Sequence, residues 1–427
     1  MLVPRCAAAL SILCAVWLFP HRSSRAQSPD RDQDQEEARD GDRDREPAAD
    51  ADADAEVDAA RPRSPAPAAS PSDRAPPLAQ PAPAADLPDF ALLPFGYIRV
   101  QGSVVQDDPN VAFVGRADGI ELMNARAGVD GRLGERVGFR LSIDGAVDER
   151  DQVNDPNGTL RVALRDAFVD LHVLPRVDLR AGRAEPMFDP EEIVGDTRRQ
   201  FIERALPSRG VRPTDGWETR SLSPGRSLGV AVRSDPGPPA SGVAIGYEIA
   251  AQNGADEFAT DNDNDALAVS AGLLVRLPAD GFVLVAGRYN PRTEGELPFQ
   301  QDETDLQGSA GLGIQVGPLS LGGGLMVERT SFEDTGGPAE QSLGAWGQGL
   351  VRLPLSPDAP FALGYRFGYL EPSDLISTDR IMEHTGGAVW QLPAWHLRAL
   401  LNATLVVEQA ARDLSNNRVE AALEVSL

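Results

Sequence analysis

Hydrophobic and polar residues alternate along the chain from about residue 95 to its end. In the stretch 136–147 (RVGFRLSIDGAV), Val137 and Phe139 lie on one side of an extended chain, while Arg140 and Ser142 lie on the other. A period of two is typical of a β-strand with one apolar face, whereas a helix would repeat every three to four residues. Sixteen segments show the pattern, near 95–104, 119–130, 136–147, 160–174, 177–183, 227–234, 242–251, 266–277, 281–289, 305–316, 319–329, 342–353, 361–370, 382–392, 395–408 and 417–427.

The connections between these segments are alternately long and short. Long polar connections follow the odd-numbered segments, as at 148–159, and short ones follow the even-numbered segments, as at 175–176. Two of the latter, near 235–241 and 354–360, are of medium length and rich in proline. A soluble β-sandwich has no reason to gather its long loops at one end. Outer-membrane barrels combine an even number of antiparallel strands with long loops on one side and short turns on the other. The pattern therefore predicts an all-β fold, a transmembrane antiparallel β-barrel of about 16 strands.

One segment breaks the alternation. In 160–174, Arg161 and Arg165 share the parity of Val169 and Leu171, so a regular strand would turn both arginines toward lipid. An arginine at mid-membrane on the lipid face costs about 2–4 kcal/mol. We therefore expect either a β-bulge here or a position of the arginines near the membrane interface.

The longest stretch without alternation is 184–226, after the fifth segment. A structureless connection of this length inside a compact domain is usually functional. We expect it to be the third external loop and to fold into the pore. It carries seven arginines, Arg198, Arg199, Arg204, Arg209, Arg212, Arg220 and Arg226, and eight carboxylates, Glu185, Asp189, Glu191, Glu192, Asp196, Glu203, Asp215 and Glu218.

The first 26 residues have the features of a secretory signal peptide. Arg5 precedes the apolar run 6–19, and 24–26 (SRA) offers a small-x-small cleavage site. Both cysteines, Cys6 and Cys14, lie within this segment. The mature chain is therefore expected to contain no disulfide and no thiolate chemistry.

Residues 27–89 differ in composition from the rest of the chain. They are first acidic and then rich in proline and alanine, so they lack the apolar area needed to offset the entropy of ordering. We interpret them as a disordered spacer in the periplasm, followed by the barrel at 90–427. The chain has a net charge of −25, and all 40 of its basic residues are arginines. So acidic a chain is not expected to bind nucleic acid, and no apolar run is long enough for a transmembrane helix.

Four stretches resemble a known family. They are LRDAFVDLHVLPRVDLRAGR (164–183), FIERALPSRG (201–210), PGRSLGV (224–230) and YEIAAQNGAD (247–256). They are similar to the phosphate-selective porins, the polyphosphate/phosphate porin family of bacterial outer membranes, and the resemblance extends over about 95–427. It implies a sixteen-stranded, typically trimeric, anion-preferring channel that is narrowed by its third external loop.

The arginines of this loop are the strongest candidates for function. Guanidinium groups bind phosphate through paired hydrogen bonds, and rings of arginine select anions in pores. Alternatively, the arginines pair with the loop's own carboxylates and only brace it, or acids and bases face each other in a mixed-charge constriction, which we favour. The candidate constriction and solute-binding residues are Arg198, Arg199, Arg204, Arg209, Arg212, Arg126, Arg140, Arg180, Glu191, Glu192 and Glu203.

Other candidate chemistry is weaker. Asp261, Asp263 and Asp265 suggest calcium, but the glycine and glutamate that an EF-hand loop requires are replaced by Ala266 and Gly272. The three histidines after the signal segment, His172, His384 and His396, have no His or Cys partner at metal-ligand spacing. No nucleophile-elbow sequence is present. We therefore expect no metal site, no cofactor and no enzymatic activity.

The predicted function is a porin for passive diffusion of small hydrophilic solutes or ions, with phosphate and other anions as candidates. The alternative is a barrel that serves as an anchor or surface-interaction protein without significant transport. The expected partners are outer-membrane lipid and lipopolysaccharide, small ions or solutes, and further copies of the chain in a homotrimer. Ion conduction through the barrel would distinguish the porin from the anchor.

Overall fold

The computed structural model describes residues 90–427, with gaps at 112–113, 116–117, 150–158, 213–214, 238, 240, 255–261, 263, 296–299, 334–336, 355–358 and 411–413. The expected signal peptide, the expected periplasmic spacer and the aspartates Asp261 and Asp263 lie outside the described residues. No helix within the described ranges is long and apolar enough to cross a membrane.

Sixteen strands form the fold, and every alternating segment of the sequence corresponds to one of them. The strands are β1 (Phe90–Val105), β2 (Gly119–Leu133), β3 (Val137–Glu149), β4 (Thr159–Leu174), β5 (Val177–Ala184), β6 (Ser227–Ser234), β7 (Ala244–Asn253), β8 (Leu267–Arg276), β9 (Phe282–Glu294), β10 (Gln301–Val316), β11 (Leu319–Phe332), β12 (Glu340–Leu353), β13 (Phe361–Glu371), β14 (Asp379–Leu392), β15 (Leu397–Ala410) and β16 (Arg418–Ser426).

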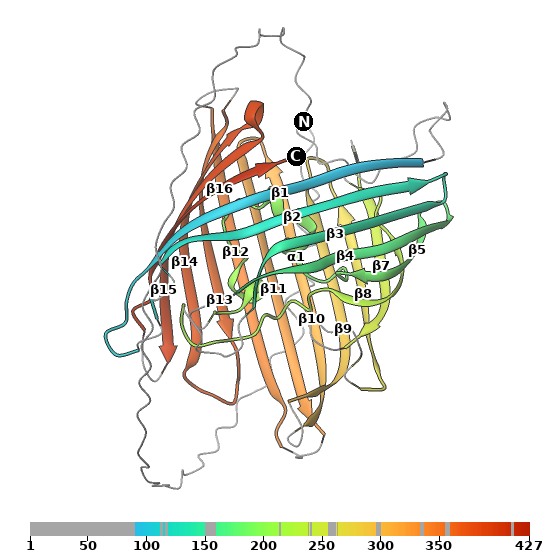
Figure 1. Ribbon diagram of the computed structural model, residues 1–427. Helices are drawn as coiled ribbons and strands as arrows, with labels where there is room; N and C mark the ends of the chain where they lie inside the picture. Colours follow the sequence, from blue (N-terminus) through green and yellow to red (C-terminus); the bar gives the residue numbers. More distant parts are fainter. Residues whose placement is uncertain are drawn as a thin grey trace, which may run out of the picture. The chain divides into compact units, whose positions relative to one another are not determined.

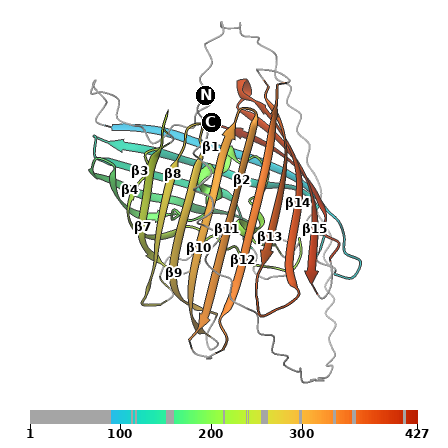
Figure 2. The same cartoon turned by 180° about the vertical axis from the view of Figure 1, so that it is seen from behind.

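The strands close into one antiparallel barrel. Each strand pairs with its neighbours in sequence, and β1 pairs with β16, as in the register Ile98↔Val425. In Figure 1, β1–β4 cross the front of the barrel and β9–β13 form the wall behind them, while Figure 2 shows that wall from its other side. Each strand therefore has a hydrogen-bonded neighbour on both sides, and the sheet has no edge strand, as a sheet in lipid requires. The predicted barrel of about 16 strands is confirmed.

Alternation of side chains gives the barrel an apolar outer face and a polar inner face. In β16, Val419, Leu423 and Val425 are about half exposed on the outside, whereas Glu420 and Glu424 are each only 1% exposed inside. Lipid would cover the outer apolar band. The inner carboxylates need partners within the barrel, because an unpaired buried charge is costly.

The expected irregularity in β4 is a β-bulge. Ser142 of β3 pairs with Asp166, but the next residue, Ile143, pairs with Leu164, so Arg165 has no opposite residue. The extra residue changes the parity of the strand. Val162 and Leu164 face outward on one side of the bulge, as Val169 does on the other. The strand therefore keeps aliphatic residues toward lipid without presenting Arg161 there.

The connections after the even-numbered strands lie at one end of the barrel, and those after the odd-numbered strands, which include the longest, lie at the other. Several short turns place a residue in the left-handed region of backbone space, including Arg176 (φ 66°), Asp280 (φ 61°) and His396 (φ 53°). The end with the long connections is called the external end below, after the arrangement that is typical of outer-membrane barrels. The opposite end carries the short turns.

Candidate functional site

The connection between β5 and β6 lies inside the barrel. This inward loop, residues 185–226, contains α1 (Pro190–Val194), the 3₁₀ turn η1 (Asp196–Arg198) and α2 (Leu206–Arg209). Phe188, Phe201 and Ile202 are each at most 1% exposed, although no strand of the barrel contains them. Figure 1 shows α1 within the barrel outline, between the front strands and the back wall. The loop therefore packs within the barrel and does not extend into solvent.

Glycines on the inner wall make room for this loop. We call Gly272, Gly311, Gly344, Gly368 and Gly387 the glycine track. A Cβ added to Gly311 would lie 2.3 Å from Cγ of Pro190, and one added to Gly344 would lie 2.5 Å from Cβ of Pro207. Added Cβ atoms at Gly368 and Gly387 would meet Leu206 and Phe201. The five glycines therefore allow the loop to approach the wall closely.

Apolar contacts accompany the glycine track. Ile202 packs with Val389, Leu400 and Ala422, and Leu206 packs with Met326, Leu370 and Ile381. Met187 forms a third cluster with Leu274, Phe282 and Leu284. Fully burying one such side chain contributes about 1.5–3 kcal/mol. The inner wall from β8 to β16 is therefore partly apolar. The alternation of the sequence alone would predict a polar inner face.

The wall formed by β1, β2 and β4 holds the loop through polar contacts. Asp196 accepts a hydrogen bond from Tyr97 (3.0 Å) and one from Nη1 of Arg126 (2.8 Å). Arg226 donates from Nε to Asp166 of β4 at 3.0 Å. Because the same loop packs on β8–β14, it bridges the lumen from one wall to the other.

All seven arginines of the loop form ion pairs. Arg198 pairs with Asp280, Arg199 with Asp196, Arg204 with Glu185 and Glu192, Arg209 with Glu203 and Glu383, Arg212 with Glu121, Glu203 and Asp215, Arg220 with Asp305 and Glu328, and Arg226 with Asp166, Glu185 and Glu192. Their charges are therefore compensated where they stand.

The three candidate arginines of the wall are divided between two roles. Arg126 lies between Asp166 of its wall and Asp196 of the inward loop, with 9% of its side chain exposed. Arg140 makes a two-pronged pair with Asp130, at 2.6 and 2.8 Å, and Arg180 makes one with Asp170, at 2.8 Å for both bonds. Both of these pairs join directly opposed residues of adjacent strands. The structure thus brings Arg126 to the loop and leaves Arg140 and Arg180 in cross-strand pairs.

The predicted acidic residues hold the loop together. Glu191 accepts a hydrogen bond from the backbone N–H of Ala205 (2.6 Å), and Glu192 pairs with Arg204. Glu203 lies 3.0 Å from Arg209 and 2.9 Å from Arg212. These contacts match the bracing role that the sequence left open.

Glu203 is the centre of the charge cluster. Arg418 of β16 approaches it at 3.7 Å, and Arg366 of β13 donates to its backbone carbonyl at 2.9 Å. The surrounding arginines hold the pKa of Glu203 well below its usual range, in spite of its burial. Glu203 therefore stays ionised at any ordinary pH and links the loop to both β13 and β16.

A second wall cluster binds the loop backbone. Arg99 of β1 donates from Nε to Glu424 (2.9 Å), from Nη2 to the carbonyl of Asp196 (3.0 Å) and from Nη1 to the carbonyl of Ile202 (3.3 Å). Arg398 shares Glu424 at 3.0 Å. Arg398 and Glu424 were not among the site residues predicted from the sequence, although both are buried on the inner face. Their inward parity was the signal available.

Asp189 gives the inward loop a pH dependence. It caps α1 by accepting from the N–H of Glu191 (2.9 Å), and it also accepts from the hydroxyl of Ser208 (3.1 Å). Burial raises its pKa from the ordinary 3.8 to about 6, although Arg204 opposes the shift. The protonated form is therefore favoured in the docked loop. The stabilisation of docking by protonated Asp189 is therefore fully present below pH 3.8 and is lost as the pH rises through about 6.

We expect the inward loop to dock more tightly at pH 4.5 than at pH 7.5, so that any ion current through the barrel is quieter at the lower pH. The physical reason is the raised pKa of Asp189, because a pKa shift of about two units corresponds to about 3 kcal/mol between the two protonation states. Asp189→Asn should remove this part of the pH dependence while keeping the cap. Current noise of the two proteins across this pH range measures the difference. Equal pH profiles would show that Asp189 does not control docking.

No group of three or more His, Cys, Asp or Glu side chains that could hold a metal ion occurs in the described ranges. His172 lies 2.6 Å from Asp178, and His384 lies 2.7 Å from the hydroxyl of Tyr365.

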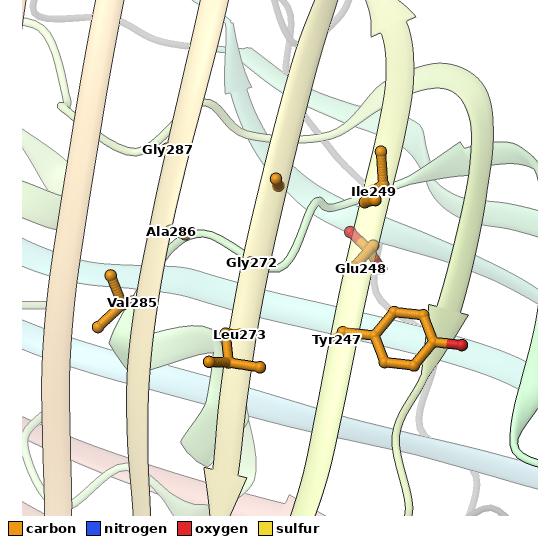
Figure 3. Close-up of a pocket in the computed structure, with 9 residues that line it drawn as sticks. Tyr247, Glu248, Ile249, Gly272, Leu273, Val285, Ala286 and Gly287 are labelled. Atoms are coloured by element: carbon orange, nitrogen blue, oxygen red, sulfur yellow. The ribbon is translucent and has the colours of Figure 1, made fainter.

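A hollow on the outer face is separate from the loop. It lies over β7–β9, where Figure 3 shows Ile249, Leu273 and Val285 projecting from three adjacent strands. These side chains are about half exposed and apolar, and Gly287, which has no side chain, also lines the hollow. The hollow therefore faces the lipid side and does not belong to the lumen.

Comparisons with known proteins show a local likeness in sequence and a shared fold. Residues 97–273 match the family model of the phosphate-selective porins O and P. No curated protein matches the sequence.

Solved outer-membrane channels share the fold at low sequence identity. A loop-L8 deletion mutant of OmpT from Vibrio cholerae has a TM-score of 0.53 at 12% identity, covering 80% of this chain and 100% of its own. The channel DcaP of Acinetobacter baumannii gives 0.52 at 13%, covering 79% and 97%. An anion-selective porin from Comamonas acidovorans gives 0.53 at 12%, covering 79% and 100%. Identities this low establish the fold alone.

Proposed function

We propose that this chain, a porin related over residues 97–273 to the phosphate-selective porins O and P, forms a narrow channel for small hydrophilic solutes and ions in the bacterial outer membrane. The inward loop is its constriction. The constriction has mixed charge and does not select phosphate. The residues that set it are those predicted from the sequence in the loop, together with Arg126, Arg366 and Arg418 of the wall.

The pairing of the loop arginines carries this proposal. A phosphate ion would have to displace Asp196, Glu203 or another carboxylate already bound to the guanidinium group it approaches. Breaking a buried ion pair leaves an uncompensated charge and costs about 3–5 kcal/mol. A filter for anions needs arginines with free donors on the solute path. The arrangement therefore favours opposed charges that orient water and small polar solutes.

A barrel that acts mainly as an anchor is the second candidate. The observation in its favour is the extent of packing inside the barrel, where Ile202, Leu206 and Gln101 are fully buried. A loop packed on both walls narrows the lumen strongly. A channel of very low conductance and an anchor differ only in whether ions pass.

We also propose the orientation and assembly of the protein. The first residue of β1, Phe90, pairs with Leu133 beside a short turn, so the chain before it starts at the end with the short turns. In outer-membrane barrels this end faces the periplasm, which would place 27–89 there. A homotrimer, embedded in lipid and lipopolysaccharide, follows from the family likeness. Crosslinking in detergent would test it.

Single-channel recording of the mature protein in a planar bilayer tests the proposed function. We expect small open steps, a reversal potential in a KCl gradient that favours potassium or neither ion, and no block by phosphate. Block by phosphate together with chloride preference would restore an anion filter. The absence of steps from folded protein would favour the anchor.

A further inference from the structure

We infer that a cavity at the external end of the lumen binds organic cations that carry amine or guanidinium groups. This inference rests on the proposed channel function and names the class of solute that binds at the external entrance of the channel. The cavity lies between residues 218–222 of the inward loop and the external ends of β9–β13, and it has a volume of about 340 Å³. We call it the mouth cavity.

The walls of the mouth cavity combine acidic groups with an apolar floor. Glu218 of the loop and Glu303 and Glu340 of the barrel line it, and Leu222 and Leu370 close it on the inner side. Leu222 and Leu370 are at most 3% exposed, because both belong to the apolar cluster that anchors α2. An aliphatic chain with charged ends fits such a lining, since its methylene groups can contact the floor while its ends reach carboxylates.

The charges around the mouth cavity do not balance. Arg292 is shared by Glu294 (2.6 Å), Glu303 (2.8 Å) and Asp305 (2.9 Å). Glu218 and Glu340 line the cavity, yet neither forms an ion pair with another residue in the described part of the chain. The cavity therefore has an excess of negative charge that a cation would neutralise.

The loop itself shows how a guanidinium binds there. Arg220 lines the cavity and places Nη2 between Glu328, Asp305 and the hydroxyl of Thr330, at 3.8 Å from Asp305 and 3.3 Å from Thr330. Both carboxylates are at most 3% exposed, whereas 47% of the Arg220 side chain is exposed. Arg220 thus acts as a tethered cation with an accessible side chain. A solute with the same chemistry can bind beside it or exchange with it.

The composition of the site favours an organic cation over a metal ion. Within the described residues, no cluster of carboxylates and histidines has the geometry to hold a metal. The volume lies at the lower end of the range of small-molecule sites, about 300–1,000 Å³. Two free carboxylates and a floor of leucines suit a small diamine or a guanidinium compound.

The external rim would concentrate such solutes. Exposed carboxylates at the external ends of strands and in external loops include Asp107, Asp118, Glu294, Asp302, Glu333 and Asp374. A mouth lined by one sign of charge raises the local concentration of oppositely charged solutes, and salt weakens the effect. The rim and the mouth cavity therefore act in the same direction.

Block of the single-channel potassium current by 1,4-diaminobutane tests the inference, with succinate as the anion of matched length. In the mature protein at 0.1 M KCl we expect block by the diamine and none by succinate. In the double variant Glu218→Gln/Glu340→Gln the half-blocking concentration should rise about fivefold or more. In Arg220→Gln it should fall, because the tethered competitor is gone. Glu135→Gln, which changes an exposed carboxylate in a short turn at the opposite end of the barrel, should behave as the wild type.

The outcomes separate this inference from the proposed function. Open steps with no diamine block, or equal block in the double variant and the wild type, would overturn the inference and leave the channel intact. Absence of steps would overturn the channel. In that case calorimetric titration of the detergent-solubilised proteins with 1,4-diaminobutane still decides whether the mouth cavity binds the diamine. Binding should be weaker in Glu218→Gln/Glu340→Gln and tighter in Arg220→Gln than in the wild type, and equal binding would overturn the inference.

Discussion

Replacing Glu203 by glutamine is expected to release the inward loop and to shift the channel toward anions. Glu203 compensates Arg209, Arg212 and Arg418 in a site where its own side chain is 5% exposed. Removing one partner of a buried ion pair costs about 3–5 kcal/mol, since the remaining charges lose their counterion. The loop should then dock less tightly, and the freed arginines should attract anions.

The reversal potential in a KCl gradient and the single-channel conductance measure this effect. We expect a larger, noisier conductance and a reversal potential shifted toward chloride. Glu135→Gln, at an exposed carboxylate in a short turn, is the matched control. An unchanged reversal potential in Glu203→Gln would contradict the central role of the cluster.

Acid should not reproduce the Glu203→Gln phenotype in the ordinary range. Because the folded pKa of Glu203 is lowered, its contribution to docking is present above the ordinary value of 4.5 and is lost only as the pH falls through the lower folded value. Between pH 7 and pH 5 the pH dependence of docking should therefore come from Asp189 and not from Glu203.

Gly311→Ala is expected to displace α1 from the barrel wall. The new Cβ would lie 2.3 Å from Cγ and 2.4 Å from Cβ of Pro190, which forces the helix or the wall to move. Overpacking of this kind costs about 1–3 kcal/mol. The barrel strands should still close, because the added methyl group lies on the inner face of β10 and leaves its backbone pairing with β9 and β11 in place. We expect a higher conductance and faster proteolysis within 185–226.

Gly347→Ala is the matched control for this change. Gly347 lies in β12, and a Cβ added there would meet nothing within 4 Å. It makes the same chemical change in a strand without touching the loop. If Gly347→Ala altered conductance as much as Gly311→Ala, the effect would belong to strand glycines in general and not to the docking of α1.

The candidate site could be predicted in part. The sequence identified the inward loop as a break in the alternation, and the structure places its arginines beside acids of the same loop and of the walls. Pair partners such as Glu383 and Glu424 were visible as inward-facing residues. Which arginine meets which acid could not be read from spacing, because Arg209 and Glu383 are separated by 174 residues and are joined only by barrel closure.

The sequence by itself determined the barrel. A period of two along sixteen segments sets the strands, their two faces and the alternation of turns and loops, because strand geometry is local and repeats along the chain. The parity conflict at Arg165 even located the bulge. Only the tertiary structure decided what the inner face does. Glycines of β8, β10 and β12–β14 lie together along the docked loop. Arginines of the loop pair with distant carboxylates of the wall, such as Glu383 and Glu328, as well as with carboxylates of the loop. Packing and ion pairing depend on distances between segments, which a pattern along one chain does not contain.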